Sequence, residues 1–280
     1  MRVVAQNANV IARWCGVRDL SALTCEALRS EVGLASGAAD LFVLFGGGVV
    51  GSLQTLVAAM REGVARRYAI VGGRGHATYW LDRAFAAELE VGHIPDLGVV
   101  AGESSEAEML DALLSVHYGL HADLLETRST NCGNNISNLL DLLEAEGALE
   151  AVQGVPTSVI LCQDAVMQRR MDATWQRQVQ DRPRFARTQI INWAAYEAEL
   201  ADKNGQLAWA AAPEGIWPID AYLQLLQGEV MRLHDDEHGY GPRGRDFVAH
   251  VDVPSHVLEA ARALDELVGD AGRPPDERYA

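Results

Sequence analysis

The chain has 280 residues, of which 49% are hydrophobic and 22% are charged, a composition typical of a globular protein. Its formal net charge of -16 argues against nucleic acid or an anionic membrane surface as a partner, because phosphate groups are bound by clustered Lys and Arg. No apolar run approaches the ~20 residues that cross a bilayer, and the first residues are too polar for a signal peptide, so we predict a cytoplasmic protein.

The first predicted elements alternate between helix and strand. Residues 1–35 are expected to form an N-terminal helical segment. From residue 36 to residue 192, short apolar runs alternate with stretches whose apolar residues recur at helical spacing. The runs predicted to be strands are Asp40–Phe45, Tyr68–Val71, Asp123–Glu126, Ser158–Cys162 and Thr188–Ile191. This alternation predicts an α/β domain over 36–192, with a parallel sheet covered by helices on both faces.

The remainder of the chain is predicted to be a smaller, mostly helical C-terminal subdomain over 193–270. Apolar residues at helical spacing indicate one helix over 223–233 and another that begins after Pro254. The last residues, 271–280, are expected to be a disordered tail.

Four loops of unusual composition follow the predicted strands: Gly46–Gly48, Gly72–His76, Ser129–Asn135 and Gln163–Arg170. In open α/β sheets, ligands bind beyond the carboxyl ends of the strands. We therefore expect these loops to gather at one edge of the sheet and to enclose a small-molecule ligand.

Residues 46–51 (GGGVVG) match the glycine pattern of dinucleotide-binding turns. That fingerprint also requires an acid at the end of the second strand, where this chain has Gly72, Gly73 and Arg74. Two alternatives stay open: the glycines form only a tight turn, or Arg74 receives the phosphate of a phosphorylated dinucleotide.

The stretch STNCGNN (129–135) places Ser129, Asn131, Asn134 and Asn135 at a predicted helix N-terminus. Free N–H groups there attract anions, and short polar side chains cap the helix. One capping residue would suffice, so the crowding favours a binding site over capping alone. Three carboxylates are expected near the same edge, on Glu106, Glu126 and Asp164, together with Arg169 or Arg170.

Two further patterns lie near the C-terminus. His234 and His238 have i, i+4 spacing, but Gly239 follows at once, and the four cysteines form no CxxC pair, so we predict no metal site. Arg243 and Arg245 lie among glycines beside Asp246. These arginines either staple the C-terminal segment to the core or form an anion clamp over the site.

These segments together resemble the YdcF-like proteins of the ElyC/SanA/YdcF superfamily, a bacterial group named for a domain of unknown function. The stretches that carry the resemblance are GGRGH (72–76), STNCGNN (129–135), MQRRMDATW (167–175) and HDDEHGYGPRGRDFVAHVDVP (234–254). The resemblance covers nearly the whole chain. It implies a Rossmann-like three-layer fold and S-adenosylmethionine as cofactor. This chain departs from the superfamily at Asn134, where Glu is usual, and at Val166, where many members have His; both changes remove an ionisable group.

The residues expected to bind the cofactor combine superfamily positions with the four loops and the C-terminal arginine. They are Gly46, Gly47, Gly48, Gly72, Gly73, Arg74, Gly75, His76, Glu106, Glu126, Ser129, Asn131, Asn134, Asn135, Gln163, Asp164, Met167, Arg169 and Arg243. The expected function is S-adenosylmethionine binding, with methyl or alkyl transfer to a small molecule as the reaction it would serve. The alternatives are a phosphate- or nucleotide-handling enzyme and a ligand-binding regulatory protein without turnover. No catalytic residue, acceptor or oligomeric state follows from the sequence.

Overall fold

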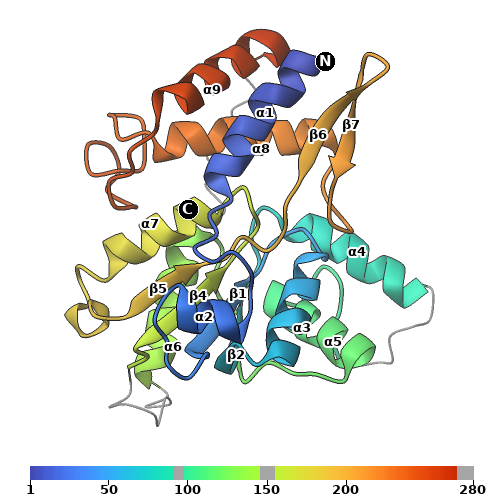
Figure 1. Ribbon diagram of the computed structural model, residues 1–280. Coiled ribbons are helices and arrows are strands. Elements are labelled where there is room, and N and C mark those ends of the chain that lie inside the picture. Colours follow the sequence, from blue (N-terminus) through green and yellow to red (C-terminus); the bar gives the residue numbers. More distant parts are fainter. Residues whose placement is uncertain (91–97, 146–154, 270–280) are drawn as a thin grey trace.

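The computed structural model describes residues 1–90, 98–145 and 155–269 (Figure 1). Its main feature is a parallel sheet of five strands in the order β3-β2-β1-β4-β5. The strands are β1 (Ala39–Phe45), β2 (Ala65–Val71), β3 (Leu124–Glu126), β4 (Ser158–Cys162) and β5 (Gln189–Asn192). Each coincides with a predicted run, and no strand boundary differs from its prediction by more than 3 residues.

The central strand β1 explains why these runs are almost continuously hydrophobic. All seven of its residues are buried, and it pairs in parallel with β2 on one side and β4 on the other. Leu41, Val43 and Phe45 contribute to the core on one face of the sheet, whereas Phe42 and Leu44 contribute to the core on the opposite face. A strand covered on both faces needs apolar side chains at successive positions, not only at alternate ones.

Helices form the two outer layers. The helices of the α/β domain are α2 (Cys25–Ser30), α3 (Ser52–Glu62), α4 (Thr78–Glu90), α5 (Glu106–Tyr118), α6 (Cys132–Ala145) and α7 (Gln168–Gln178), with a 3-10 turn, η1 (Pro183–Phe185). The apolar residues of α3 and α5 belong to one core, and those of α6, with Met171 and Trp175 of α7, to the other. The predicted α/β fold with a Rossmann-like three-layer arrangement is therefore confirmed.

A smaller layer, which we call the cap, lies beside the α/β domain (Figure 1). It consists of α1 (Arg2–Cys15), β6 (Glu199–Lys203), β7 (Gln206–Ala211), α8 (Ile219–Leu233) and α9 (Ser255–Val268). The N-terminal helix α1 packs against α8, α9 and β6. The Asn9 side chain also pairs with the backbone of Leu200, with both hydrogen bonds at 2.9 Å. The first and last helices of the described residues thus share one layer.

The hairpin of β6 and β7 departs from the expected, mostly helical C-terminal part. Its turn contains Asn204 and Gly205, both with positive φ, at 57° and 82°. An Asn-Gly pair is a strong hairpin signal because it adopts this left-handed turn at low cost. That signal was present in the sequence. Among the helices of the described residues, none is long and apolar enough to cross a membrane. The predicted tail, 271–280, lies outside the described residues.

Candidate functional site at the carboxyl edge of the sheet

The carboxyl ends of β1 and β4 are neighbours at the point where the strand order reverses. From β1 the chain continues to β2 and β3 on one side, while β4 and β5 occupy the other. Ligands of open α/β sheets bind at such a position. The Gln163 side chain links the segments that follow these two strands. Its Nε2 donates to the Gly46 carbonyl at 3.2 Å, and its Oε1 accepts from Asp164 N at 2.6 Å.

Two glycines in this turn allow carboxyl groups to approach the backbone closely. A Cβ on Gly46 would overlap the Oε2 atom of Glu106, and a Cβ on Gly47 would lie 2.5 Å from Asp164 Oδ2. Neither glycine has a positive φ, so the close approach, not an unusual conformation, requires glycine here. The turn after β1 therefore lies between two acidic side chains.

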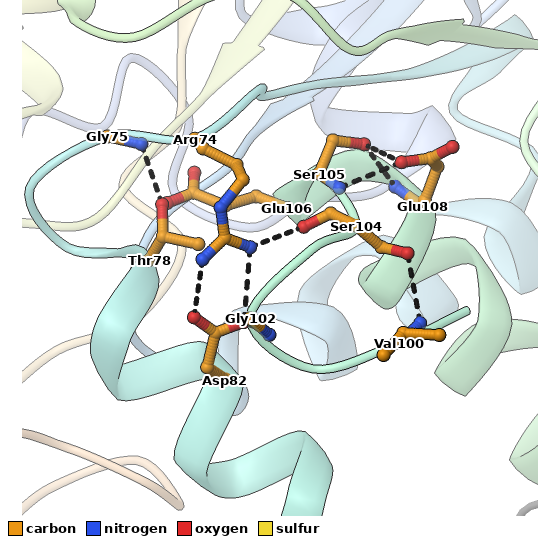
Figure 2. A network of polar contacts seen from close by, with 10 residues as sticks. All are labelled: Arg74, Gly75, Thr78, Asp82, Val100, Gly102, Ser104, Ser105, Glu106 and Glu108. Atoms are coloured by element: carbon orange, nitrogen blue, oxygen red, sulfur yellow. Dashed lines mark hydrogen bonds and ion pairs between the residues drawn. The ribbon is translucent and has the colours of Figure 1, made fainter.

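Glu106 is held in place by the start of α5 and the exit of β2. It is the first residue of α5, whose predicted capping box of Ser105 and Glu108 is present. Its N–H donates to the Gly73 carbonyl at 2.9 Å. Its Oε1 accepts a hydrogen bond from Thr78 Oγ1 at 2.5 Å, and the same hydroxyl accepts from Gly75 N (Figure 2). These contacts fix the carboxyl group beside Gly46 and Gly72.

Arg74 supports the same loops through a polar network (Figure 2). Its guanidinium forms an ion pair with Asp82 at 2.7 Å and donates to the Ser104 carbonyl at 2.6 Å. Asp82 also accepts from Gly102 N at 2.8 Å. The charge of Arg74 is thus balanced within the protein, and its role is to tie α4 to the segment that precedes α5.

Burial makes both acids of the site hard to ionise. It raises the pKa of Glu106 to about 7, although the Thr78 hydroxyl and the charge of Arg74 act in the opposite direction. The pKa of Asp164 is raised well above its ordinary value by burial and then by the nearby charge of Glu106. An ionised carboxylate is costly in a buried site unless a cation or several donors accompany it. Burial and the charge of Glu106 therefore both favour the protonated form of Asp164.

Asp164 Oδ2 has no hydrogen-bond partner within the described residues, although it is fully buried. It lies on the side of Gly47 where another residue would carry its Cβ. Buried polar atoms in folded proteins are nearly always hydrogen-bonded, so each exception needs an explanation. Here the exception coincides with the switch point of the sheet, and a ligand that donates to Oδ2 would resolve it.

The Ser/Asn cluster mainly organises its own loop. Asn131 Oδ1 accepts from Asn134 N at 3.0 Å, and Asn134 Oδ1 accepts from Asn131 N at 2.9 Å, a reciprocal cap at the start of α6. Ser129 Oγ accepts from Gly73 N at 3.0 Å. Both oxygens of Glu126 accept hydrogen bonds, from Arg128 N, Ser129 N and Asn138 Nδ2. Capping and loop bracing thus account for more of this cluster than the sequence suggested.

An open cavity of about 230 Å³ lies next to this loop, between the end of β3 and α6. It is lined by Leu125, Glu126, Thr127, Arg128, Asp141, Leu142 and Ala145. Both Glu126 oxygens already accept hydrogen bonds within the protein, in contrast to Oδ2 of Asp164 beside Gly47.

The arginines expected to bind an anion are engaged elsewhere. Arg169 donates to the Trp14 carbonyl at 2.7 Å, and its guanidinium lies 4.7 Å from the centre of the Trp14 ring. Arg170 forms an ion pair with the buried Glu229 at 2.8 Å. These contacts join α7 to the cap and leave neither arginine directed at the glycine turn.

The C-terminal segment with Arg243 is held against the far end of α7. The backbone N–H of Arg243 donates to Asp235 at 2.8 Å, and its side chain is exposed. Asp246 pairs with Arg177, near the C-terminus of α7, at 2.8 Å. The segment is thus stapled to α7, but by Arg177 with Asp246 and not by the side chain of Arg243, as one of the two predicted alternatives had it. His234 lies within 2.9 Å of Asp236, two residues further on.

The other predicted residues surround the same edge. Gly75 packs against the Thr130 carbonyl, and the half-buried His76 follows it in the loop before α4. Met167 is the N-cap of α7, and Asn135 is buried in the first turn of α6. The loops after β1, β2, β3 and β4 therefore meet at one edge, as the sequence predicted.

Two site residues escaped the sequence analysis. Trp217 Nε1 lies 2.5 Å from the position that a Cβ of Gly48 would occupy. Burial raises the pKa of Tyr196, and the charge of Asp164 raises it further. Both residues are buried. They belong to segments between β5 and α8, outside the strand–loop–helix units. An isolated aromatic residue in such a segment gives no pattern that identifies it.

The fold and the site define a Rossmann-like α/β protein with a buried, acid-lined turn at its switch point. A comparison with models of known protein families finds no match. The site itself is therefore the basis for a functional proposal.

Proposed function

We propose that the chain binds a small molecule carrying a cationic group at this edge, and that S-adenosylmethionine is this ligand. Transfer of its methyl or alkyl group to a small molecule is the reaction that such binding would serve. One observation carries the proposal: a fully buried carboxyl group, Asp164, with an unpartnered oxygen at the switch point of the sheet.

The charges around the turn favour a cation over a phosphate. Glu106 and Asp164 flank Gly46 and Gly47, whereas the guanidinium of Arg169 lies over Trp14. A phosphate ligand would approach two carboxyl groups, and the arginine whose charge reaches Glu106, Arg74, is already paired with Asp82. A further negative charge would oppose ionisation of both acids, whereas a cation would favour it. This distribution favours S-adenosylmethionine over the nucleotide alternative.

The residues of the turn suit a sulfonium ligand in two ways. The acids supply carboxyl oxygens whose ionised form a cation would favour, and the glycines admit close backbone approach. When bound, S-adenosylmethionine supplies an activated methyl group, so the protein contributes mainly alignment of the two reactants. Buried Trp217 would exclude water from the turn. Because the Asp164 and Trp217 side chains pack directly on the glycines, ligand entry requires them to move off the turn.

Calorimetric titration with S-adenosylmethionine tests the proposal. The wild-type protein should bind it, and Asp164→Asn should weaken binding about ten- to hundredfold, because a hydrogen bond to a charged group contributes roughly 1.5–3 kcal/mol. Glu259→Gln is the matched control, since it removes one negative charge from an exposed position on α9. ATP and ADP, titrated in parallel, represent the phosphate alternative. Absence of binding heat with S-adenosylmethionine, or equal affinity of the Asp164 variant, would overturn the proposal.

A further inference from the structure

The connection between β7 and α8, residues 212–218, lies over the glycine turn of the candidate site, and we call it the strap. It descends from the cap towards the start of α4 (Figure 1). Within the strap Trp217 alone is buried, while the other residues are exposed or half-buried. Trp217 Nε1 lies 2.5 Å from the position of a Cβ on Gly48. The strap therefore covers the turn with one buried side chain.

Two backbone contacts also join the strap to the turn. Gly51 N donates to the Glu214 carbonyl at 3.0 Å, the one hydrogen bond between strap and turn in the described part of the chain. A Cβ on Gly215 would lie 3.7 Å from Val50 Cβ. Trp217 is held by packing, since its Nε1 has no partner within the described residues. Segments with few buried contacts and few hydrogen bonds open at low free energy. The strap thus has few contacts to break on leaving the turn.

The two ends of the strap are held together independently of the turn. Trp209 of β7 packs edge-on against Tyr222 of α8, with ring centroids 4.8 Å apart. Tyr222 is buried in the cap, and β7 pairs with β6. Within the strap, Gly215 has a φ of 71°, a left-handed conformation that glycine adopts without strain. A loop with anchored ends can move at such a residue while β7 and α8 stay in place.

We propose that the strap is a gate, which closes the glycine turn in this structure and moves off it to admit the ligand. Gly47 and Gly48 are buried, so a ligand reaches Gly48 only after Trp217 has left. Reclosure over the bound ligand would then exclude water from the reacting group. The inference rests on the proposed function for the ligand, but the movement itself can be measured without one.

An engineered disulfide tests the gate by locking it. In Val50→Cys combined with Gly215→Cys, the Cβ atoms would be 3.7 Å apart, within the range of roughly 3.5–4.5 Å found in disulfides. Amide hydrogens of residues 46–51 should exchange roughly tenfold or more slowly in the oxidised than in the reduced protein. The association rate of radiolabelled S-adenosylmethionine should fall by a similar factor. A reductant should restore both rates, and the amides of β1 serve as internal reference.

The reduced double variant is the matched control, because it carries the same two substitutions, including a side chain at the positive φ of residue 215. The two single variants detect pairing of either new thiol with Cys25, a partly buried native cysteine. Neither single variant should show a slower exchange on oxidation.

Gly51→Ala should bias the gate in the opposite direction. A Cβ there would lie 2.7 Å from the Glu214 carbonyl oxygen and 2.8 Å from Pro213 Cβ, so the strap backbone must shift away. The φ of Gly51 is -59°, which alanine adopts without strain, so α3 should keep its start. Exchange of residues 46–51 and association of S-adenosylmethionine should both become several-fold faster.

The outcomes separate the gate from the proposed function. If S-adenosylmethionine associates equally fast with the oxidised and the reduced double variant, the gate is wrong and the proposed function stands. If no form of the protein binds S-adenosylmethionine, but oxidation slows exchange of residues 46–51 and Gly51→Ala accelerates it, the gate stands and the proposed function is wrong. Exchange of residues 46–51 that neither change affects would show a strap fixed on the turn and would overturn the inference.

Discussion

The side chains of Glu106 and Asp164 pack against two consecutive glycines of the turn after β1, although 57 residues separate the two acids in sequence. Glu106 contacts Gly46 from the N-terminus of α5, and Asp164 contacts Gly47 from the exit of β4. The charge of Glu106 is the second largest cause of the raised pKa of Asp164, after burial. The two acids are therefore coupled, and a proton or a cation at one affects the other.

Stability should fall as pH rises from about 4.5 to 7. In the folded protein the pKa of Glu106 is about 7, whereas its ordinary value is 4.5. Between these values the folded state keeps a proton that the unfolded chain has released, so raising the pH favours unfolding by on the order of 3 kcal/mol. Glu106→Gln keeps the acceptor for Thr78 and should reduce this dependence, as measured by urea unfolding across the pH range.

Glu108, two residues further along α5, is the internal contrast to Glu106. Hydrogen bonds from the Ser105 hydroxyl and backbone N–H lower its pKa. Its contribution to stability is present above its unfolded pKa and is lost as pH falls through the folded pKa. Glu108→Gln should therefore change the free energy of unfolding at acid pH and leave it unchanged near neutral pH. If both variants altered it over the same pH range, the burial argument for Glu106 would be wrong.

Binding of S-adenosylmethionine should release a proton. In the free protein, burial and the charge of Glu106 raise the pKa of Asp164, whereas the cationic group of the ligand favours the ionised form. Affinity should therefore increase with pH by up to about tenfold per unit, over the range in which Asp164 of the free protein still carries its proton. Calorimetry in two buffers of different ionisation enthalpy measures the released proton. Asp164→Asn should abolish the release; an unchanged release in this variant would assign the proton to another group.

Two glycine substitutions should separate binding from folding. A Cβ on Gly47 meets the end of the Asp164 side chain, which can rotate away, so Gly47→Ala should abolish ligand binding at a small cost in stability. A Cβ on Gly73 overlaps the backbone carbonyl of Ser129, which cannot rotate, so Gly73→Ala should destabilise the protein by roughly 1–3 kcal/mol or more. Thermal unfolding and titration compare them; a fully stable Gly73→Ala would contradict the packing of these loops.

The cap should depend on the buried charge of Glu229. This carboxylate is fully buried and pairs with Arg170 at 2.8 Å and Arg232 at 3.2 Å. Glu229→Ala leaves the largely buried Arg170 without its partner and should cost about 3–5 kcal/mol in the free energy of unfolding. Glu229→Leu combined with Arg170→Met should recover much of this loss, because it removes the Glu229–Arg170 pair as a unit and leaves only the charge of Arg232. Equal destabilisation by the single and the double variant would show that packing, not charge, is decisive.

Local sequence patterns were sufficient for the α/β part of the fold. The run at β4 was predicted with its observed ends, and the capping box of Ser105 and Glu108 was predicted from two residues. These features depend on neighbours in sequence, such as burial of successive strand residues and hydrogen bonds within one helical turn. The Asn204–Gly205 turn also depends on neighbouring residues, so the same reasoning could have predicted its hairpin.

Tertiary structure decided which of the predicted site residues face one another. The sequence placed four polar loops at one edge, and the strand order then set Asp164 beside the turn after β1. Arg169, in contrast, donates to the Trp14 carbonyl. Asn134 accepts a hydrogen bond at the N-terminus of α6. Tyr196 and Trp217 reach the site only because the cap folds onto this edge. A side chain's partner across a fold is set by packing between distant segments, whereas helix and strand formation is set by the spacing of residues a few positions apart.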